Sequence, residues 1–90
     1  MYEIEFSNDA LREAAYLRKT EPAAYRKLEL LLIELANNPR FVTGQIELMK
    51  YDLRGYYSRR ITRKHRIVYS VKDDILTVYV VSVYGHYSDK

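Results

Sequence analysis

The chain carries an almost unbroken apolar run near its C-terminus, 75-ILTVYVVSVY-84, rich in β-branched and aromatic residues. Such residues suit a pleated strand, and a strand without polar alternation is covered on both faces. We therefore expect residues 75–84 to form a central strand. With 90 residues in all, the other segments must supply both the neighbouring strands and the cover for this one.

The remaining elements follow from apolar periodicity and from helix caps. Ser7 is a suitable N-cap for a first helix, and Thr20, followed by Pro22, can begin a second one. The sequence predicts a strand at 2–6, helices at about 8–19 and 22–36, a short strand near Leu48, strands at about 56–62 and 66–72, and the strand at 75–84.

Two helices joined by so short a link form an antiparallel hairpin. We expect a single α+β domain over residues 1–90, in the order β-α-α-β-β-β, with the helical hairpin packed on one face of a mostly antiparallel sheet. In so small a domain the opposite face is expected to be partly open. An open sheet face with aromatic and basic residues suits single-stranded RNA.

Positive charge is concentrated in one segment. Residues 1–45 carry six Lys and Arg against seven Asp and Glu, whereas residues 46–90 carry nine against five. Residues 50–66 contain seven basic side chains and a single acidic one, Asp52. A basic patch on a nearly neutral body favours a polyanionic partner, although a solvated surface would give the same composition.

Composition excludes several classes of protein. The chain has no cysteine, so disulfides, thiolate metal sites and a cysteine nucleophile are ruled out. Its N-terminus has no secretory signal, and no apolar run is long enough to span a membrane. We expect a cytoplasmic protein. Carboxylates and histidines are not spaced as metal ligands, so we expect no metal and no cofactor.

The segment 56-YYSRRITRKHRIVY-69 predicts a hairpin with an anion site. If the turn is centred on Arg63, then Arg60 lies opposite Arg66 on the same face of the sheet. Like charges opposite one another destabilise a sheet unless an anion such as phosphate lies between them. His65 is expected to be a solvated residue of this turn.

Three further side chains could take part in acid–base or phosphate chemistry. Glu47 alternates with apolar residues, Lys50 follows it, and His86 comes directly after the strand expected at 75–84. Taken singly, each is most simply an ordinary surface residue. Together with two arginines they would suffice for metal-free RNA cleavage, which needs a base, an acid and cations at the phosphate.

The order of these residues resembles a known family. The run 47-ELMKYDLRGYYSRRITRKHRIVY-69 and the later 84-YGHY-87 are similar to the Txe/YoeB toxins of bacterial toxin–antitoxin modules, within the RelE superfamily. The resemblance covers essentially the whole chain. It departs in Gly85, which places the His-Tyr pair one residue later than is common, and in the three residues after Tyr87.

The resemblance implies a RelE-like toxin fold and an endoribonuclease that cuts mRNA in the ribosomal A site. It also implies a YefM-type antitoxin and a homodimer. Carried over residue by residue, Glu47 would be the base and His86 the acid, while Arg60 and Arg66 would stabilise the phosphate and Tyr87 would orient the substrate. Binding of the substrate backbone is assigned to Lys50, Arg59, Arg63 and Lys64.

Two other functions remain open from the sequence. ParE-type proteins use the same fold to poison DNA gyrase without acid–base residues, so the set Glu47, Arg66 and His86 favours the nuclease. Alternatively, the basic hairpin could bind RNA without cutting it.

Overall fold

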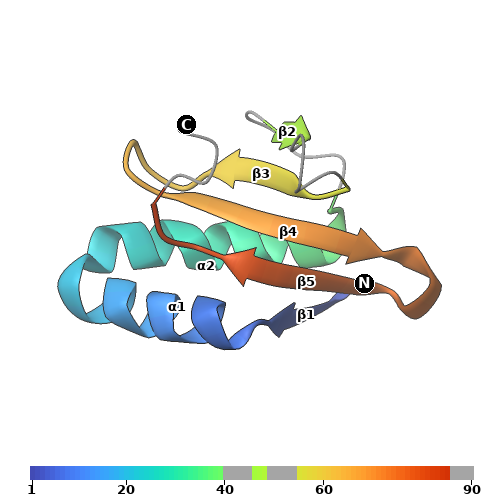
Figure 1. Ribbon diagram of the computed structural model, residues 1–90, viewed down its shortest axis with the longest axis horizontal. Helices are drawn as coiled ribbons and strands as arrows, with labels where there is room; N and C mark the ends of the chain where they lie inside the picture. The colour runs from blue at the N-terminus through green and yellow to red at the C-terminus, as the bar shows by residue number, and fades with distance from the viewer. Residues whose placement is uncertain (40–45, 49–54, 86–90) are drawn as a thin grey trace.

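The computed structural model describes residues 1–39 and 55–85, and the backbone of residues 46–48. Its elements follow one another along the chain as Figure 1 shows. They are β1 (Glu3–Phe6), α1 (Asn8–Thr20), α2 (Pro22–Asn37), β2 (Ile46–Leu48), β3 (Tyr57–Arg60), β4 (Arg66–Lys72), the 3-10 turn η2 (Asp73–Ile75) and β5 (Thr77–Ser82).

The strands form one five-stranded sheet in the order β1-β5-β4-β3-β2. The edge strand β1 is parallel to its neighbour β5, and the other neighbouring strands are antiparallel. The helical hairpin α1–α2 lies along one face of this sheet (Figure 1). The expected α+β fold is therefore confirmed, and the segment expected near Leu48 contributes a fifth, short strand at the sheet edge.

β5 occupies an interior place in the sheet, as its apolar run predicts. Thr77, Val78, Val80 and Ser82 are buried, whereas Tyr79 and Val81 are only half-buried, so the expectation that both faces of this strand are fully covered is not met. The strand begins later than expected, because the chain first makes the η2 turn and then a left-handed residue at Leu76, whose φ is 49°. Leu76 is consequently 51% exposed, despite belonging to the apolar run.

The N-cap expected from the sequence is present at α1 but not at α2. The Ser7 hydroxyl accepts the Ala10 N–H at 3.0 Å and donates to the Val81 carbonyl at 2.8 Å, so it joins α1 to the sheet. The expected cap at Thr20 is wrong. Thr20 is the last residue of α1 and donates to the Tyr16 carbonyl, and Glu21 precedes α2 without a side-chain cap. Its carboxylate is engaged elsewhere, as described below.

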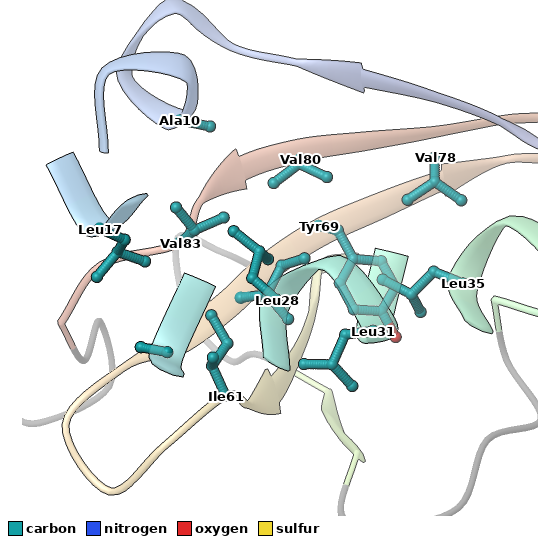
Figure 2. Packing of buried hydrophobic residues seen from close by; sticks show 12 residues of the cluster. Ala10, Leu17, Leu28, Leu31, Leu35, Ile61, Tyr69, Val78, Val80 and Val83 are labelled. Atoms are coloured by element: carbon teal, nitrogen blue, oxygen red, sulfur yellow. The ribbon is translucent and has the colours of Figure 1, made fainter. Parts of the chain in front are cut away.

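The core lies between the hairpin and one face of the sheet (Figure 2). Leucines of α2 at positions 28, 31 and 35 point toward β4 and β5, and they surround the fully buried ring of Tyr69. The cluster comprises Ala10, Leu17, Ala24, Leu28, Leu31, Leu35, Ile61, Ile67, Tyr69, Val78, Val80 and Val83. Burying such side chains stabilises the fold by roughly 1.5–3 kcal/mol each.

Candidate functional site

Arg60 and Arg66 form a cross-strand pair. They are direct register partners on β3 and β4, next to the turn that joins the two strands. Register partners lie on the same face of a sheet, so the pairing expected from the sequence is confirmed. The two side chains differ in environment, since Arg60 is exposed and Arg66 is only 8% exposed.

The buried guanidinium of Arg66 is held in place by a neighbouring hydroxyl. Its Nε donates to Ser58 Oγ at 2.6 Å, and Ser58 is itself buried. A guanidinium is always charged in a protein, whether exposed or buried. Burial also reduces solvent screening of that charge. Arg66 therefore brings a fixed positive charge to the face of the sheet that is turned away from the helices.

The backbone register places position 47 on the same face of the sheet as the arginine pair, in the neighbouring cross-strand row. Glu47 on β2 pairs with Ser58 on β3, which pairs in turn with Val68 on β4. Position 47 is therefore on the face that holds Arg60 and Arg66, one strand away from Ser58.

Gly85 brings the chain back to Arg66. The Arg66 N–H donates to the Gly85 carbonyl at 3.0 Å, although the two residues are distant in sequence. Residue 86 follows this hydrogen-bonded carbonyl directly. Lys50, His86 and Tyr87 lie outside the described residues, so their proposed roles rest on the sequence together with these neighbouring positions.

Arg59 lies on the opposite face from Arg60 and Arg66. It alternates with Arg60 along β3, its side chain is buried, and its Nη1 contacts Glu34 Oε1 of α2 at 2.8 Å. This ion pair joins the sheet to the helical layer. The geometry gives Arg59 a structural role, because its side chain is on the helical face of the sheet and not on the face that carries the arginine pair.

Arg63 and Lys64 lie in the exposed turn between β3 and β4. The Lys64 side chain is 71% exposed, and its Nζ lies 3.7 Å from Glu21 Oε1 at the start of α2. Both residues are accessible to a polyanion. They lie in the turn beside the arginine pair and not on the strands that carry it.

His65 differs from the expectation of a solvated turn residue, because it is only 2% exposed. Its Nε2 lies 3.1 Å from Glu21 Oε2, and its Nδ1 accepts the Gly85 N–H at 3.0 Å. Local sequence contains no signal for this burial, since the partners are 44 and 20 residues away. Glu21 and His65 are thus residues that sequence reasoning missed.

The face that carries the arginine pair is also less open than expected. Ser58, Val68 and Ser70 are buried there, whereas Arg60 at the end of the row is exposed. Small side chains at the centre of the face allow close packing. Of these four residues, Arg60 is therefore the one accessible to a ligand.

The described part of the chain has neither a metal-binding cluster nor a membrane span. Among residues 1–39, 46–48 and 55–85, no three His, Cys, Asp or Glu side chains gather closely enough to hold a metal ion. Neither α1 nor α2, the two helices described, has the length and apolar character that crossing a bilayer requires.

Comparison with protein families gives a match over residues 6–87 to the YoeB-like toxin of bacterial type II toxin–antitoxin systems. Among individual proteins, the chain is 33% identical to toxin YoeB of Escherichia coli K12 over 73 residues, which cover 81% of this chain and 87% of that protein.

Solved structures show the same architecture. A YoeB/ParE toxin from Agrobacterium tumefaciens superposes with a TM-score of 0.87 at 27% identity, covering 94% of this chain and 99% of that one. A YoeB dimer from Staphylococcus aureus gives 0.83 at 33% identity, with coverages of 96% and 98%. The heterotetrameric YoeB–YefM toxin–antitoxin complex from the same organism gives 0.82 at 33% identity, with coverages of 97% and 99%.

Proposed function

The chain belongs to the YoeB-like toxins of bacterial type II toxin–antitoxin systems, and we propose that it is an endoribonuclease that cuts mRNA in the A site of translating ribosomes. The observation that carries this proposal is the pairing of Arg60 with Arg66 beside the Gly85 carbonyl. The pair supplies cations for a phosphate, and the chain reaches the same end of the sheet at Gly85, one residue before His86 in the sequence.

The reaction that these residues suit is transfer of the scissile phosphoryl group to the neighbouring 2′-oxygen. Glu47 takes the proton of the 2′-hydroxyl, whose oxygen forms a bond to phosphorus. The bond from phosphorus to the 5′-oxygen breaks, and His86 donates a proton to that leaving oxygen. The products are a 2′,3′-cyclic phosphate and a free 5′-hydroxyl, and no oxidant or further reactant is needed.

The arginines act on the charge that develops during this reaction. Negative charge grows on the non-bridging phosphate oxygens, and guanidinium groups already placed beside them stabilise it without further reorganisation. Because its Nε is tied to Ser58, Arg66 is held in one orientation. Lys50 would add a phosphate contact and Tyr87 would stack on a base, as the resemblance implies.

The described histidine is unsuited to the role of general acid. Both ring nitrogens of His65 are engaged, one with Glu21 and one with Gly85, and the residue is buried. A proton donor must reach the leaving oxygen, directly or through one water. This favours His86, the only other histidine in the sequence.

The proposal extends to two protein partners. The Staphylococcus aureus relative is described as a dimer and as a complex with YefM. We expect this chain likewise to form a homodimer and to bind a YefM-type antitoxin, with an acidic segment of the antitoxin on the basic region of residues 50–66. Co-purification with the product of the adjacent small reading frame tests this expectation.

The test of the activity is to map mRNA ends after adding purified protein to a translation reaction, with and without active ribosomes. Wild-type protein should produce cuts within translated codons only. Glu47→Ala, Arg66→Ala and His86→Ala should each abolish them while the protein remains folded. Full cleavage by all three variants would refute the assigned site. Gyrase-linked DNA breaks, with mRNA left intact, would instead indicate a gyrase poison.

A further inference from the structure

The segment that leads out of β5 is held by contacts from three other elements. From α1, Glu13 Oε1 accepts the Val83 N–H at 2.9 Å and the Ser82 hydroxyl at 3.0 Å. From β4, Arg66 donates its N–H to the Gly85 carbonyl. From the turn before β4, His65 accepts the Gly85 N–H. Gly85 is therefore bound through both its amide and its carbonyl.

The His65 ring is itself held on two sides. Its centroid lies 4.4 Å from that of Tyr84, and Tyr84 packs edge-on against Tyr16 of α1 at 5.6 Å. On the other side, Nε2 lies 3.2 and 3.1 Å from the two carboxylate oxygens of Glu21. A buried ring with partners on so many sides has one orientation only.

These contacts also decide which ring nitrogen carries the proton. An N–H group can donate only to an unprotonated nitrogen, so Nδ1 must be free of a proton when it accepts from Gly85. The proton is then on Nε2 and is donated to Glu21. A carboxylate that sets the tautomer and orientation of an imidazole in this way is a common arrangement around functional sites.

Gly85 can accept this restraint because of its backbone conformation. Its φ is 74°, a value that L-residues with side chains rarely adopt. This turn allows the amide to face His65 while the carbonyl faces Arg66. The orientation of the Gly85 peptide groups is therefore restrained by two hydrogen bonds, from residues 65 and 66, which are consecutive in sequence.

We propose that His65, oriented by Glu21, is a positioning residue that holds Gly85, the residue before the proposed general acid in the sequence, beside Arg66. The inference rests on the proposed nuclease function, and it deepens that function by giving this pair the task of holding the residue that precedes the acid. His65 does not touch the substrate in this scheme.

Two substitutions at one position separate this role from simple packing. In His65→Asn the side-chain amide stands where Nδ1 stood, so an oxygen can still accept the Gly85 N–H. In His65→Gln the amide reaches the place of Nε2, so it can still donate to Glu21 but leaves Gly85 without its acceptor. Both variants lose the ring contact with Tyr84, so that loss cannot explain a difference between them.

The first measurement is amide hydrogen exchange of Gly85 by NMR in the full-length protein, which requires no activity. We expect His65→Gln to raise the Gly85 exchange rate about fivefold to tenfold, as loss of one hydrogen bond does. His65→Asn should stay near the wild-type rate. Glu21→Gln keeps an acceptor for Nε2 and should also remain close to wild type.

The second measurement is single-turnover cleavage on ribosome complexes. His65→Gln should lower the rate at saturating protein by about tenfold to a hundredfold, the usual effect of a misplaced catalytic group. The protein concentration at half-maximal rate should change by less than about twofold, because binding contacts are untouched. His65→Asn should recover most of the rate.

Equal losses of rate in both variants would overturn the proposal. They would show that loss of the His65 ring lowers the rate, whether or not the Gly85 N–H keeps its acceptor. So would unchanged Gly85 exchange in His65→Gln. Wild-type protein that leaves mRNA intact would refute the nuclease itself, and Gly85 exchange would then still decide whether His65 holds this segment. If His65→Gln fails to fold, comparison of Glu21→Ala with Glu21→Gln in both assays makes the same distinction.

Discussion

Replacing Arg60 by glutamine should make the protein more stable and less active at the same time. Arg60 and Arg66 are register partners of like charge, and Arg66 is buried. The β-carbons of such partners are about 5 Å apart, and we take a separation of about 8 Å between the two charges for an order-of-magnitude calculation. At that separation the repulsion is about 0.5 kcal/mol in a water-like medium and about 2 kcal/mol at the lower effective dielectric near a buried charge.

We therefore expect Arg60→Gln to raise the free energy of unfolding by about 0.5–2 kcal/mol at low ionic strength. In 1 M salt the screening length falls to about 3 Å, so most of this gain should disappear. Urea denaturation at the two salt concentrations measures the change. Arg26→Gln, which removes an exposed charge from α2, is the matched control and should show no comparable gain.

The same substitution should slow mRNA cleavage. Removing one preorganised donor to a developing oxyanion typically costs about a hundredfold to a thousandfold in rate. Lower stability of Arg60→Gln together with an unchanged cleavage rate would refute the reasoning, because the paired charges would then be neither repulsive nor functional. A loss of activity that simply follows a loss of folded protein would refute it as well.

The remaining predictions concern stability and are read from urea or thermal unfolding. Arg59→Met should cost about 1–3 kcal/mol, because it leaves Glu34 without its buried partner, and Arg59→Met combined with Glu34→Gln should recover part of that loss; additive losses would contradict the ion pair as its origin. Ser7→Ala should cost about 1–2 kcal/mol through the lost helix cap, and Ser7→Asp should cost less; no loss in Ser7→Ala would show that the cap is unimportant. At Leu76, which has a left-handed backbone, glycine should be more stable than valine by at least about 1 kcal/mol; the reverse order would contradict that conformation in solution.

Much of the fold was predictable because it depends on patterns within each segment. The apolar run at 75–84, the leucine spacing of α2 and the cap at Ser7 each indicate a local structure by a short-range physical rule. The pairing of Arg60 with Arg66 followed from the sequence only on the condition that the turn is centred on Arg63, because a shift of one residue would break it; the structure has the register that this condition requires. The family match then agrees with residues that the sequence had already singled out.

Other features depend on contacts between distant segments, and no local pattern signals them. Glu21 directly precedes α2, yet it contacts His65 from 44 positions away. Arg59 was grouped with the basic residues around it. Strand parity puts it on the helical face, where Glu34 of α2 pairs with it.

The order of residues along the chain was enough to identify the elements, the family and the charged side chains that suit phosphate chemistry, because these depend on neighbours within a few residues. How the hairpin packs against the sheet decides which charged side chains are left on the opposite face and which form contacts with the helices. His65 illustrates this division, since its neighbours in sequence are mostly basic while its contacts in space are a carboxylate, a tyrosine ring and a backbone amide. Packing supplies those contacts, and they turn an apparent surface residue into one that holds the chain beside Arg66.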